Sequence, residues 1–383
     1  MQTKIQGNGN IWIENISNDI GVAQIAFTGQ GAYGGHTTIA KGAVTFTRGD
    51  IFAPSPPNVV TIGSTGGGNA TLAAVGGGLG NMENNFVAAA NSGGTLIFAA
   101  NSSLAGAAGN INIKSSSNQT FPPSLVTLNG DLSFDNRATN GSVFVIGDPI
   151  VGAGKLTKIG PGPMLVTNTN TYAGGTEVNA GILAVGHADA ITNCCGHYTA
   201  TDGTLGSGDV TVNSTATRLE IESSLAAINV IANTATLSLA GGGSLAFADL
   251  GFAELGASIN EVVGGLILGG IAQTNPGTYG SSLSGATFQD DEYFSGAGLL
   301  TLTPAGQAGD HNGDGIVDAA DYVVWRKGLD SSGGAPAGYD AFFENFGEGG
   351  AGSGGTAGVP EPTTLVLLGL IVPYALTTRR SRA

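Results

Sequence analysis

Residues 310 to 321, DHNGDGIVDAAD, hold four aspartates in a chain that has only 28 acidic residues among 383. With Asp310 at position 1 of a twelve-residue calcium loop, an oxygen donor falls at every ligand position. These donors, at positions 1, 3, 5, 7, 9 and 12, are Asp310, Asn312, Asp314, the carbonyl of Ile316, Asp318 and Asp321. Because crowded carboxylates repel one another unless a cation neutralises them, the loop predicts one bound Ca²⁺, and a solvated acidic turn is the alternative.

The segments around this loop indicate how it is held. A helix-like stretch, AADYVVWRKGL, follows the loop, whereas LTPAGQAG before it contains Pro304 and small residues that do not favour a helix. A loop followed by one helix resembles the type I dockerin repeat, a family in which two loop–helix units pack together and each loop binds one Ca²⁺. The second unit here is AGYDAFFENFG, whose loop lacks calcium ligands, so we expect one ion.

Aromatic residues support this pairing of units. Tyr339, Phe342 and Phe346 repeat the positions of Tyr322, Trp325 and Leu329 at a spacing of 17 residues. We interpret them as a small core, with a partner surface as the alternative. Loop positions 10 and 11, which help to select a cohesin in that family, are both alanine here, so the resemblance allows a cohesin-like partner without indicating its specificity.

The C-terminal residues 359–383, VPEPTTLVLLGLIVPYALTTRRSRA, combine a Pro-Glu-Pro motif, an apolar run and a basic end. The apolar run, Leu365 to Leu376, would span about 18 Å as a helix, which is short of the ~30 Å hydrocarbon core of a membrane. The tail resembles the PEP-CTERM sorting signal, and the matching residues are Pro360, Glu361, Pro362, Arg379, Arg380 and Arg382. That family implies an exosortase-type membrane protease as partner, transient membrane anchoring at the C-terminus, and delivery to the cell surface, outer envelope or extracellular matrix.

Residues 1–304 favour an all-β body. The chain has 66 glycines and only 11% charged residues, which favours short strands and tight turns over amphipathic helices. In LTKIGPGPMLVTNTNTYAGGTEVNAGILAVG, residues 156–186, the runs MLVT and EVNAGILAV read as strands. Residues 25–44 repeat this segment in degraded form, with five identities at an offset of 139 residues: Thr28, Tyr33, Gly35, Thr37 and Gly42 match Thr167, Tyr172, Gly174, Thr176 and Gly181. Repetition of strand and glycine turn predicts stacked β-coils.

Residues 156–186 resemble the autotransporter-associated β-strand repeat, which forms coils of a right-handed parallel β-helix in exported proteins. The expected organisation is therefore a β-solenoid (1–304), a small α-helical dockerin-like calcium module (305–348), a Gly/Ser linker (349–358) and a sorting signal with a membrane segment (359–383). The first 21 residues lack the apolar stretch of a signal peptide, so we expect the reading frame to begin upstream of Met1.

Charge and cysteine content narrow the functional classes. A net charge of -15 with 13 basic residues disfavours a nucleic-acid partner. Cys194 and Cys195 are adjacent, a poor geometry for a disulfide; they read as turn residues, or alternatively as a thiol metal site with His187 and His197.

The sequence therefore predicts an exported, non-enzymatic, structural or adhesion-type surface protein that could contact an extracellular polysaccharide. A β-helix polysaccharide lyase or hydrolase is the alternative, and it would need clustered carboxylates or a basic residue on adjacent coils. The run Asp290, Asp291 and Glu292 is the acidic cluster that stands out in residues 1–304.

Overall fold

We describe the protein from a computed structural model. The residues described are 6–7, 9–14, 24–27, 32–33, 35–46, 59–65, 70–74, 81–82, 85–88, 94–98, 111–113, 125–137, 143–186, 203–213, 217–222, 225–226, 228–241, 252–303, 311, 317–328, 339–340, 342–343 and 346. The chain divides into two compact units, Met1–Ala305 and Gly306–Ala383.

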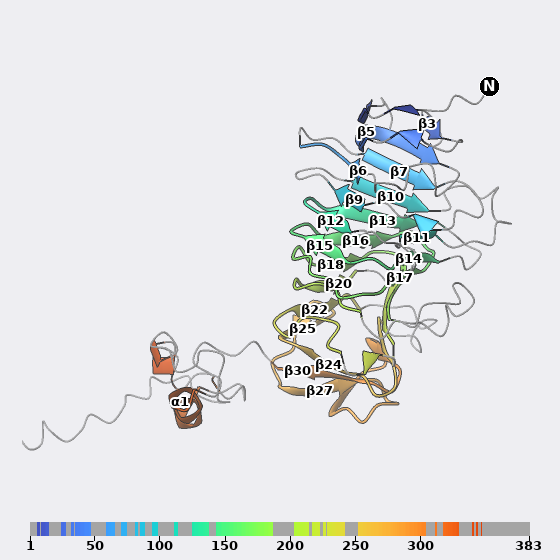
Figure 1. Ribbon diagram of the computed structural model, residues 1–383. Coiled ribbons are helices and arrows are strands. Elements are labelled where there is room, and N and C mark those ends of the chain that lie inside the picture. Colours follow the sequence, from blue (N-terminus) through green and yellow to red (C-terminus); the bar gives the residue numbers. More distant parts are fainter. Residues whose placement is uncertain are drawn as a thin grey trace, which may run out of the picture. The chain divides into compact units, whose positions relative to one another are not determined.

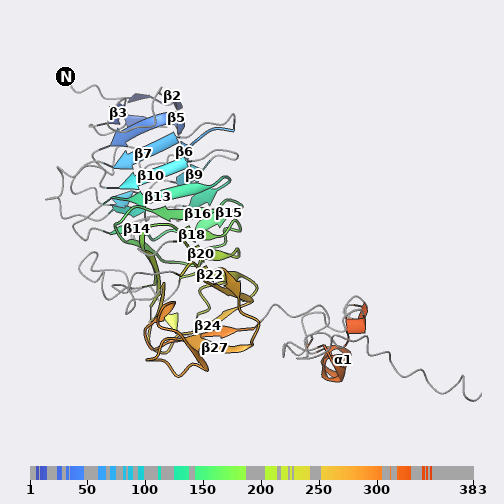
Figure 2. The ribbon, with the colours of Figure 1, turned by 180° about the vertical axis from the view of Figure 1, so that it is seen from behind.

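The first unit is built on a 16-stranded sheet with two arms that diverge from the long strand β5 (Thr37–Phe46) (Figures 1 and 2). One arm contains β2 (Ile11–Glu14), β6 (Val59–Ile62), β9 (Asn85–Ala88), β12 (Val126–Leu128) and β15 (Ile150–Gly152). The other contains β3 (Gln24–Phe27), β7 (Ala70–Ala74), β10 (Gly94–Phe98), β13 (Leu132–Asn136), β16 (Leu156–Ile159), β18 (Thr176–Val178), β20 (Val210–Val212), β22 (Thr236–Leu239), β25 (Gly265–Leu268) and β26 (Ile271–Ala272).

Three further sheets complete this unit. The 8-stranded sheet contains β8 (Asn81–Met82), β11 (Ile111–Ile113), β14 (Phe144–Ile146), β17 (Met164–Val166), β19 (Gly181–Val185), β21 (Thr217–Ile221), β23 (Ala253–Leu255) and β29 (Phe294–Ser295). The 4-stranded sheet contains β24 (Asn260–Val263), β27 (Gly277–Gly280), β28 (Phe288–Gln289) and β30 (Leu299–Leu302), and the 2-stranded sheet pairs β1 (Gln6–Gly7) with β4 (Ala32–Tyr33).

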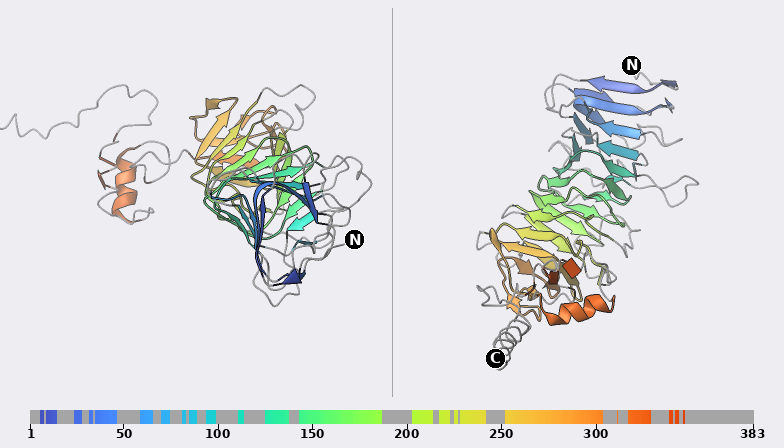
Figure 3. Two further views of the ribbon diagram at one scale, coloured as in Figure 1. Left: turned by 90° about the horizontal axis from the view of Figure 1, so that it is seen from above. Right: turned by 90° about the vertical axis from the view of Figure 1, so that its left-hand side faces the viewer.

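The chain visits these sheets in turn and returns to each one beside its previous strand. Strands β9, β10 and β11 lie in different arms or sheets, and each pairs in parallel with the strand three places later, β12, β13 and β14. Viewed from above, the strands of the first unit lie on several sides of a common interior (Figure 3). We call each such circuit a coil.

Alternation within the strands decides which side chains fill the interior. Strand β16 reads buried, half-buried, buried, half-buried, so every second residue points inward. In-register neighbours on successive strands then stack into rows, such as Phe134, Lys158, Val178, Val212 and Leu239. All five side chains of this row are fully buried, including that of the lysine.

The last coils depart from the parallel pattern. Strand β26 turns back antiparallel on β25, and β27 runs antiparallel to β30. Residues 277–302 contribute the last four strands of this unit, β27, β28, β29 and β30. At this end of the unit, antiparallel pairing therefore replaces the parallel stacking of strands, as expected for a segment that covers open strand edges.

The two copies of the internal repeat share local geometry but lie on different faces. Gly42 and Gly181 both have positive φ, at 84° and 69°, and a side chain at Gly35 or Gly174 would collide with the backbone of the preceding coil. However, Thr37 pairs with the arm of β2 and β6, whereas Thr176 pairs with β16 and β20. The run EVNAGILAV, predicted as one strand, bends at Gly181 into β18 and β19.

The second unit contains the helix α1 (Ala319–Arg326). Tyr322 and Trp325 on this helix contact Tyr339, with ring centroids 6.2 and 5.2 Å away, and Tyr322 lies 5.8 Å from Phe342. The residues expected to form the second helix, Tyr339, Asp340, Phe342 and Phe343, are helical where they are described. These aromatic side chains contact one another, but only Phe342 is buried, whereas Tyr339 and Phe346 are exposed, so the choice between a small core and a partner surface stays open.

Candidate functional site

Asn170 joins three coils through its buried side chain. Its Oδ1 accepts a hydrogen bond from the backbone N–H of Ile150 at 2.7 Å, in the preceding coil. Its Nδ2 donates to the carbonyl of Thr204 at 2.7 Å, in the following coil, and to the carbonyls of Thr167 and Asn168. An amide that both donates and accepts can satisfy several backbone groups at a turn that has no strand ladder.

Tyr172 and Thr176 form a second polar contact inside the interior. The two hydroxyl oxygens lie 2.5 Å apart, and both side chains are buried. Burial raises the pKa of Tyr172, while the hydrogen bond to Thr176 opposes this shift. The turn motif NTNTYAGGT thus acts as an internal joint, in which Asn170, Tyr172 and Thr176 supply the hydrogen bonds.

Lys158 is a fully buried cation in the interior row of β16. Its Nζ donates to three carbonyls, those of Ile159 at 2.9 Å, Gly160 at 2.7 Å and Ala180 at 2.9 Å. Burial lowers the pKa of Lys158 to about 8, and the charge of Asp135 opposes that shift. Sequence reasoning missed this residue, although the alternation of LTKI places it on the same face as Leu156.

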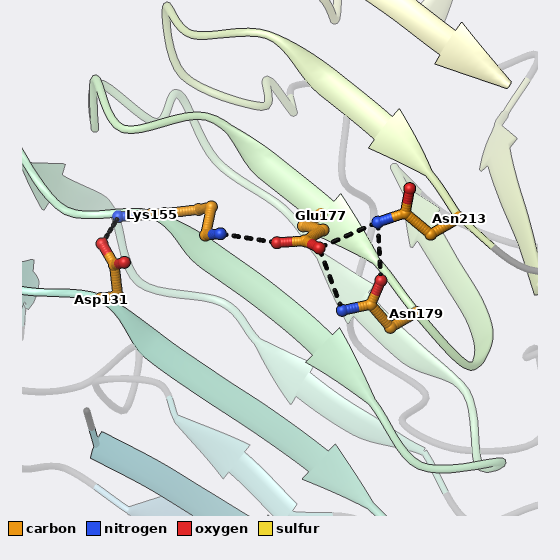
Figure 4. Close-up of polar contacts among 5 residues, drawn as sticks. All are labelled: Asp131, Lys155, Glu177, Asn179 and Asn213. Carbon is orange, nitrogen blue, oxygen red and sulfur yellow. Dashed lines mark hydrogen bonds and ion pairs between the residues drawn. The ribbon is translucent and has the colours of Figure 1, made fainter. Parts of the chain in front are cut away.

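A charged network lies on the outer face of the same sheet (Figure 4). Lys155 Nζ donates to Glu177 Oε2 at 2.6 Å, and Asn179 and Asn213 donate to Glu177 Oε1 at 3.3 and 2.9 Å. Asn213 also donates to Asn179 Oδ1 at 2.9 Å, while the backbone N–H of Lys155 donates to Asp131 Oδ1 at 2.9 Å. The network therefore connects four successive coils.

The electrostatics of this network favour an ion pair. The hydrogen bond from Lys155 is the largest cause that lowers the pKa of Glu177, and the same bond raises the pKa of Lys155. A general acid that works near neutral pH needs a raised pKa instead. Glu177 is therefore suited to fastening adjacent coils rather than to transferring protons.

A second charged cluster lies on adjacent strands of the 8-stranded sheet. Arg218 on β21 bonds to Glu220, and its Nη1 lies 2.9 Å from Glu254 Oε2 on β23. Burial raises the pKa of Glu220, with the nearby Glu254 charge acting in the same direction and Arg218 opposing it. Two carboxylates and one base on neighbouring coils form the kind of cluster that the enzymatic alternative requires.

The acidic run Asp290, Asp291 and Glu292 serves a turn. Asp291 Oδ1 accepts the backbone N–H of Ser282 at 2.6 Å, and this bond lowers the pKa of the Asp291 carboxyl. Asp290 Oδ1 accepts the backbone N–H of Glu292 at 3.0 Å. These aspartates thus have local backbone partners.

Two of the predicted calcium ligands begin helix α1. Asp318 is the N-cap and accepts the N–H of Ala320 at 2.7 Å, while Asp321 Oδ2 accepts the N–H of Asp318 at 2.7 Å, completing a capping box. Carboxylates in this position fit a calcium loop that runs into a helix, and both donors have the oxygen chemistry that Ca²⁺ requires. The other four predicted ligands, Asp310, Asn312, Asp314 and Ile316, lie outside the described residues.

Other predicted features also fall outside the described residues. These are Cys194 and Cys195 with His187 and His197, the Gly/Ser linker, and the whole tail with Pro360, Glu361, Pro362, Arg379, Arg380 and Arg382. In the ranges that the structure describes, no three His, Cys, Asp or Glu residues are grouped as a metal site. Nor does the described part of the chain contain a helix that is both long and apolar enough to cross a membrane.

Comparison with known proteins identifies one segment. Residues 156–185 match the family described as passenger-associated-transport-repeat, an autotransporter-associated repeat. This match confirms the resemblance stated for residues 156–186 and indicates an exported or cell-surface protein. No curated protein and no solved structure matches the chain. The matched segment contains Lys158, Asn170, Tyr172 and Glu177, so the repeat supplies both interior joints and outer fastenings of the coils.

Proposed function

We propose that the chain is an exported, non-enzymatic, structural or adhesion-type protein of the cell surface or extracellular matrix. Residues 1–304 would form a right-handed parallel β-helix, followed by a dockerin-like module that binds one Ca²⁺ and by an exosortase-type sorting tail. The observation that carries this proposal is the repeat match at residues 156–185, in which the matched side chains join one coil to the next.

Two further observations support the proposal. Parallel strands that recur in each sheet, with in-register interior rows, are what a β-helix requires. The contacts of Tyr322 and Trp325 with Tyr339 agree with two packed loop–helix units. A stack of coils with few charges, in a chain that also carries a separate second unit, suits display of a binding element outside the cell.

Export and sorting are tested together. The chain, fused to a secretion signal, is expressed in a host that has an exosortase, and intact cells are treated with protease. We expect the protein to be accessible at the surface and its mature form to lack the residues after the Pro-Glu-Pro motif by mass spectrometry. Glu361→Ala should retain them, whereas Glu348→Ala, at the end of the dockerin-like module and just before the linker, should be processed normally. An intact arginine cluster on the mature surface protein would refute the sorting role.

Calcium binding is tested by calorimetric titration of the purified chain. We expect a stoichiometry near one, which Asp314→Ala abolishes because it removes a carboxylate from the start of the loop. Asp340→Ala is the matched control, since Asp340 is exposed and lies in the second helical segment. Two sites, or an unchanged titration in Asp314→Ala, would contradict the proposed module.

The Arg218, Glu220 and Glu254 cluster is the observation that favours the enzymatic alternative, a polysaccharide lyase or hydrolase. The test is release of reducing or unsaturated ends from neutral and uronate polysaccharides by the whole chain. Activity that Glu220→Gln abolishes, and that Glu177→Gln leaves intact, would replace the structural proposal with the enzymatic one.

A further inference from the structure

Glu261 is a carboxyl group buried at the junction between two parts of the first unit. It lies on β24, where the buried face holds Glu261 and Val263, and the in-register residues of β30 are Leu300 and Leu302. Its side chain has no exposed surface. The position belongs to an interior row, where an apolar residue would be expected.

The contacts of Glu261 replace a strand ladder. In the described part of the chain, β24 has a backbone ladder only with β30. Toward the preceding coil, at residues 228–231, Glu261 Oε2 accepts the N–H of Val230 at 3.0 Å, and Oε1 accepts the N–H of Ile231 at 2.6 Å. Asn229 completes this connection, because its amide exchanges hydrogen bonds with the N–H and carbonyl of Val262.

Among the residues that the structure describes, no charged side chain compensates this carboxyl. The coil segment 228–235, INVIANTA, and the strand segment 299–303, LLTLT, have no ionisable side chain. On the next strand, β27, Tyr279 is the titratable residue, and its hydroxyl donates to the carbonyl of Asn275. Burial is the largest influence on the pKa of Glu261 and raises it to about 7, although the two N–H donors oppose this shift.

We propose that Glu261 makes the junction between the coil at residues 228–231 and the terminal 4-stranded sheet sensitive to pH, tight in acid and looser in alkali. The direction of the pH effect follows from the raised pKa, because the carboxyl of Glu261 binds its proton more strongly in the folded chain than in the unfolded chain. The resulting stabilisation of the junction is fully present below the pKa of the unfolded chain and is lost as pH rises through the pKa of the folded chain. Strand β30, which pairs with β24, is the last strand before the second unit begins at Gly306. The junction therefore includes the strand with which the described residues of the first unit end.

Hydrogen exchange of the full chain, measured by mass spectrometry between pH 5 and pH 8 and corrected for intrinsic rates, tests this device. The opening equilibrium of peptides covering residues 228–235 and 258–264 should rise roughly 70-fold across this interval, as expected for a pKa of about 7 against 4.5. In Glu261→Gln, which cannot titrate, the dependence should disappear. Glu220→Gln, another buried glutamate, is the control and should leave the dependence at residues 228–235 unchanged.

Two results would overturn the proposal. One is a wild-type profile that is flat or falls with pH; the other is the same rise in Glu261→Gln, which would assign the effect to another group. If Glu261→Gln does not fold, the pH dependence of hydrogen exchange in the wild-type chain is the test of the proposal. Residues 156–166 lie in a distant coil without Glu261, and an equal pH dependence there would refute a local junction.

Discussion

Lys158 loses hydration on burial in the coil interior, but it also supplies hydrogen bonds there. Its neighbours in the row are Phe134 and Val178, and among the described residues the ammonium gains carbonyl partners but no ion pair with a carboxylate. Three carbonyls satisfy its three N–H donors, and one of them, that of Ala180, belongs to the next coil. The lysine therefore fastens a corner where the backbone leaves the strand ladder.

Tyr172→Phe should lower the free energy of unfolding by about 1–2 kcal/mol, because Thr176 Oγ1 then keeps only a 3.4 Å contact with the carbonyl of Leu205. Denaturant unfolding followed by circular dichroism measures the change. A double-mutant cycle with Thr176→Val should give a coupling of about 1 kcal/mol. Tyr279→Phe, whose hydroxyl is only partly buried, is the control, and a loss in it as large as that in Tyr172→Phe would contradict the internal joint.

At the scale of elements, the sequence predicted the strands and turns better than it predicted the sheet in which each strand lies. Glycines and period-two alternation in residues 156–186 were sufficient for short strands and an internal repeat. They could not show that EVNAGILAV bends at Gly181, because a glycine inside an apolar run is compatible with either a straight strand or a corner. The face that each copy occupies depends on which strands its own strands pair with, and local patterns do not encode that pairing.

The polar sites differ in how far the sequence could reveal them. Asp318 and Asp321 were found from ligand spacing, and their capping role is also readable from their place before AADYVVWR. The network of Lys155, Glu177 and Asn213 joins residues up to 58 positions apart, so only the register of the strands brings it together. Glu261 could not be found from the sequence, because a charged residue in a strand is expected to face solvent, whereas this one lies on the buried face of β24.

Gly152→Ala should destabilise the first unit by about 3 kcal/mol. Gly152 ends β15 with φ at 112°, and a Cβ there would overlap the carbonyl of Leu128 in the preceding coil. Gly285→Ala is the matched control, because no atom lies within 4 Å of its Cβ position, and it should change stability by less than about 0.5 kcal/mol. Equal thermal stability of the two variants would mean that these coils are not stacked as closely as described.

Asp318 allows the capping role to be separated from the metal role. In EDTA, Asp318→Ala should lower the helical signal and the stability of the second unit by about 1 kcal/mol, because the N–H of Ala320 loses its acceptor. Asp318→Ser keeps a capping oxygen and should be close to the wild type in EDTA. Both variants should weaken calcium binding, since each lacks the carboxylate. If serine and alanine are equally harmful without calcium, the capping box does not stabilise the helix.

For the whole molecule, the chain is a series of coils in which each contacts its neighbours, with a separate second unit. Side chains such as Asn170, Lys158 and Glu177 add hydrogen bonds between coils to the backbone ladders. In such an array, stability is approximately the sum of coil and interface contributions. Buried ionisable groups in different coils should therefore add their pH dependences independently.

The first unit should consequently be least stable between pH 7 and pH 8. The raised pKa of Glu261, about 7, removes about 2 kcal/mol as pH rises from 5.5 to 7.5, and the raised pKa of Glu220 acts in the same direction. Lys158 has a lowered pKa of about 8, so its contribution to stability is present above the pKa of the unfolded chain and is lost as pH falls through the pKa of the folded chain. Raising the pH from 7.5 to 9.5 therefore restores about 2 kcal/mol to the free energy of unfolding.

Denaturant unfolding of the full chain, followed by the strand signal in circular dichroism at pH 5.5, 7.5 and 9.5, measures this profile. Lys158→Met should remove the rise on the alkaline side, because methionine carries no charge to desolvate, and Glu261→Gln should reduce the fall on the acidic side. The controls are Lys155→Met and Glu177→Gln, which alter a half-buried ion pair on the outer face. Their hydrogen bond raises the pKa of Lys155 and lowers the pKa of Glu177, so both pKa values move away from the interval between pH 5.5 and pH 9.5. A wild-type profile with its maximum near pH 7.5 would show that these two buried groups do not govern the stability of the coils.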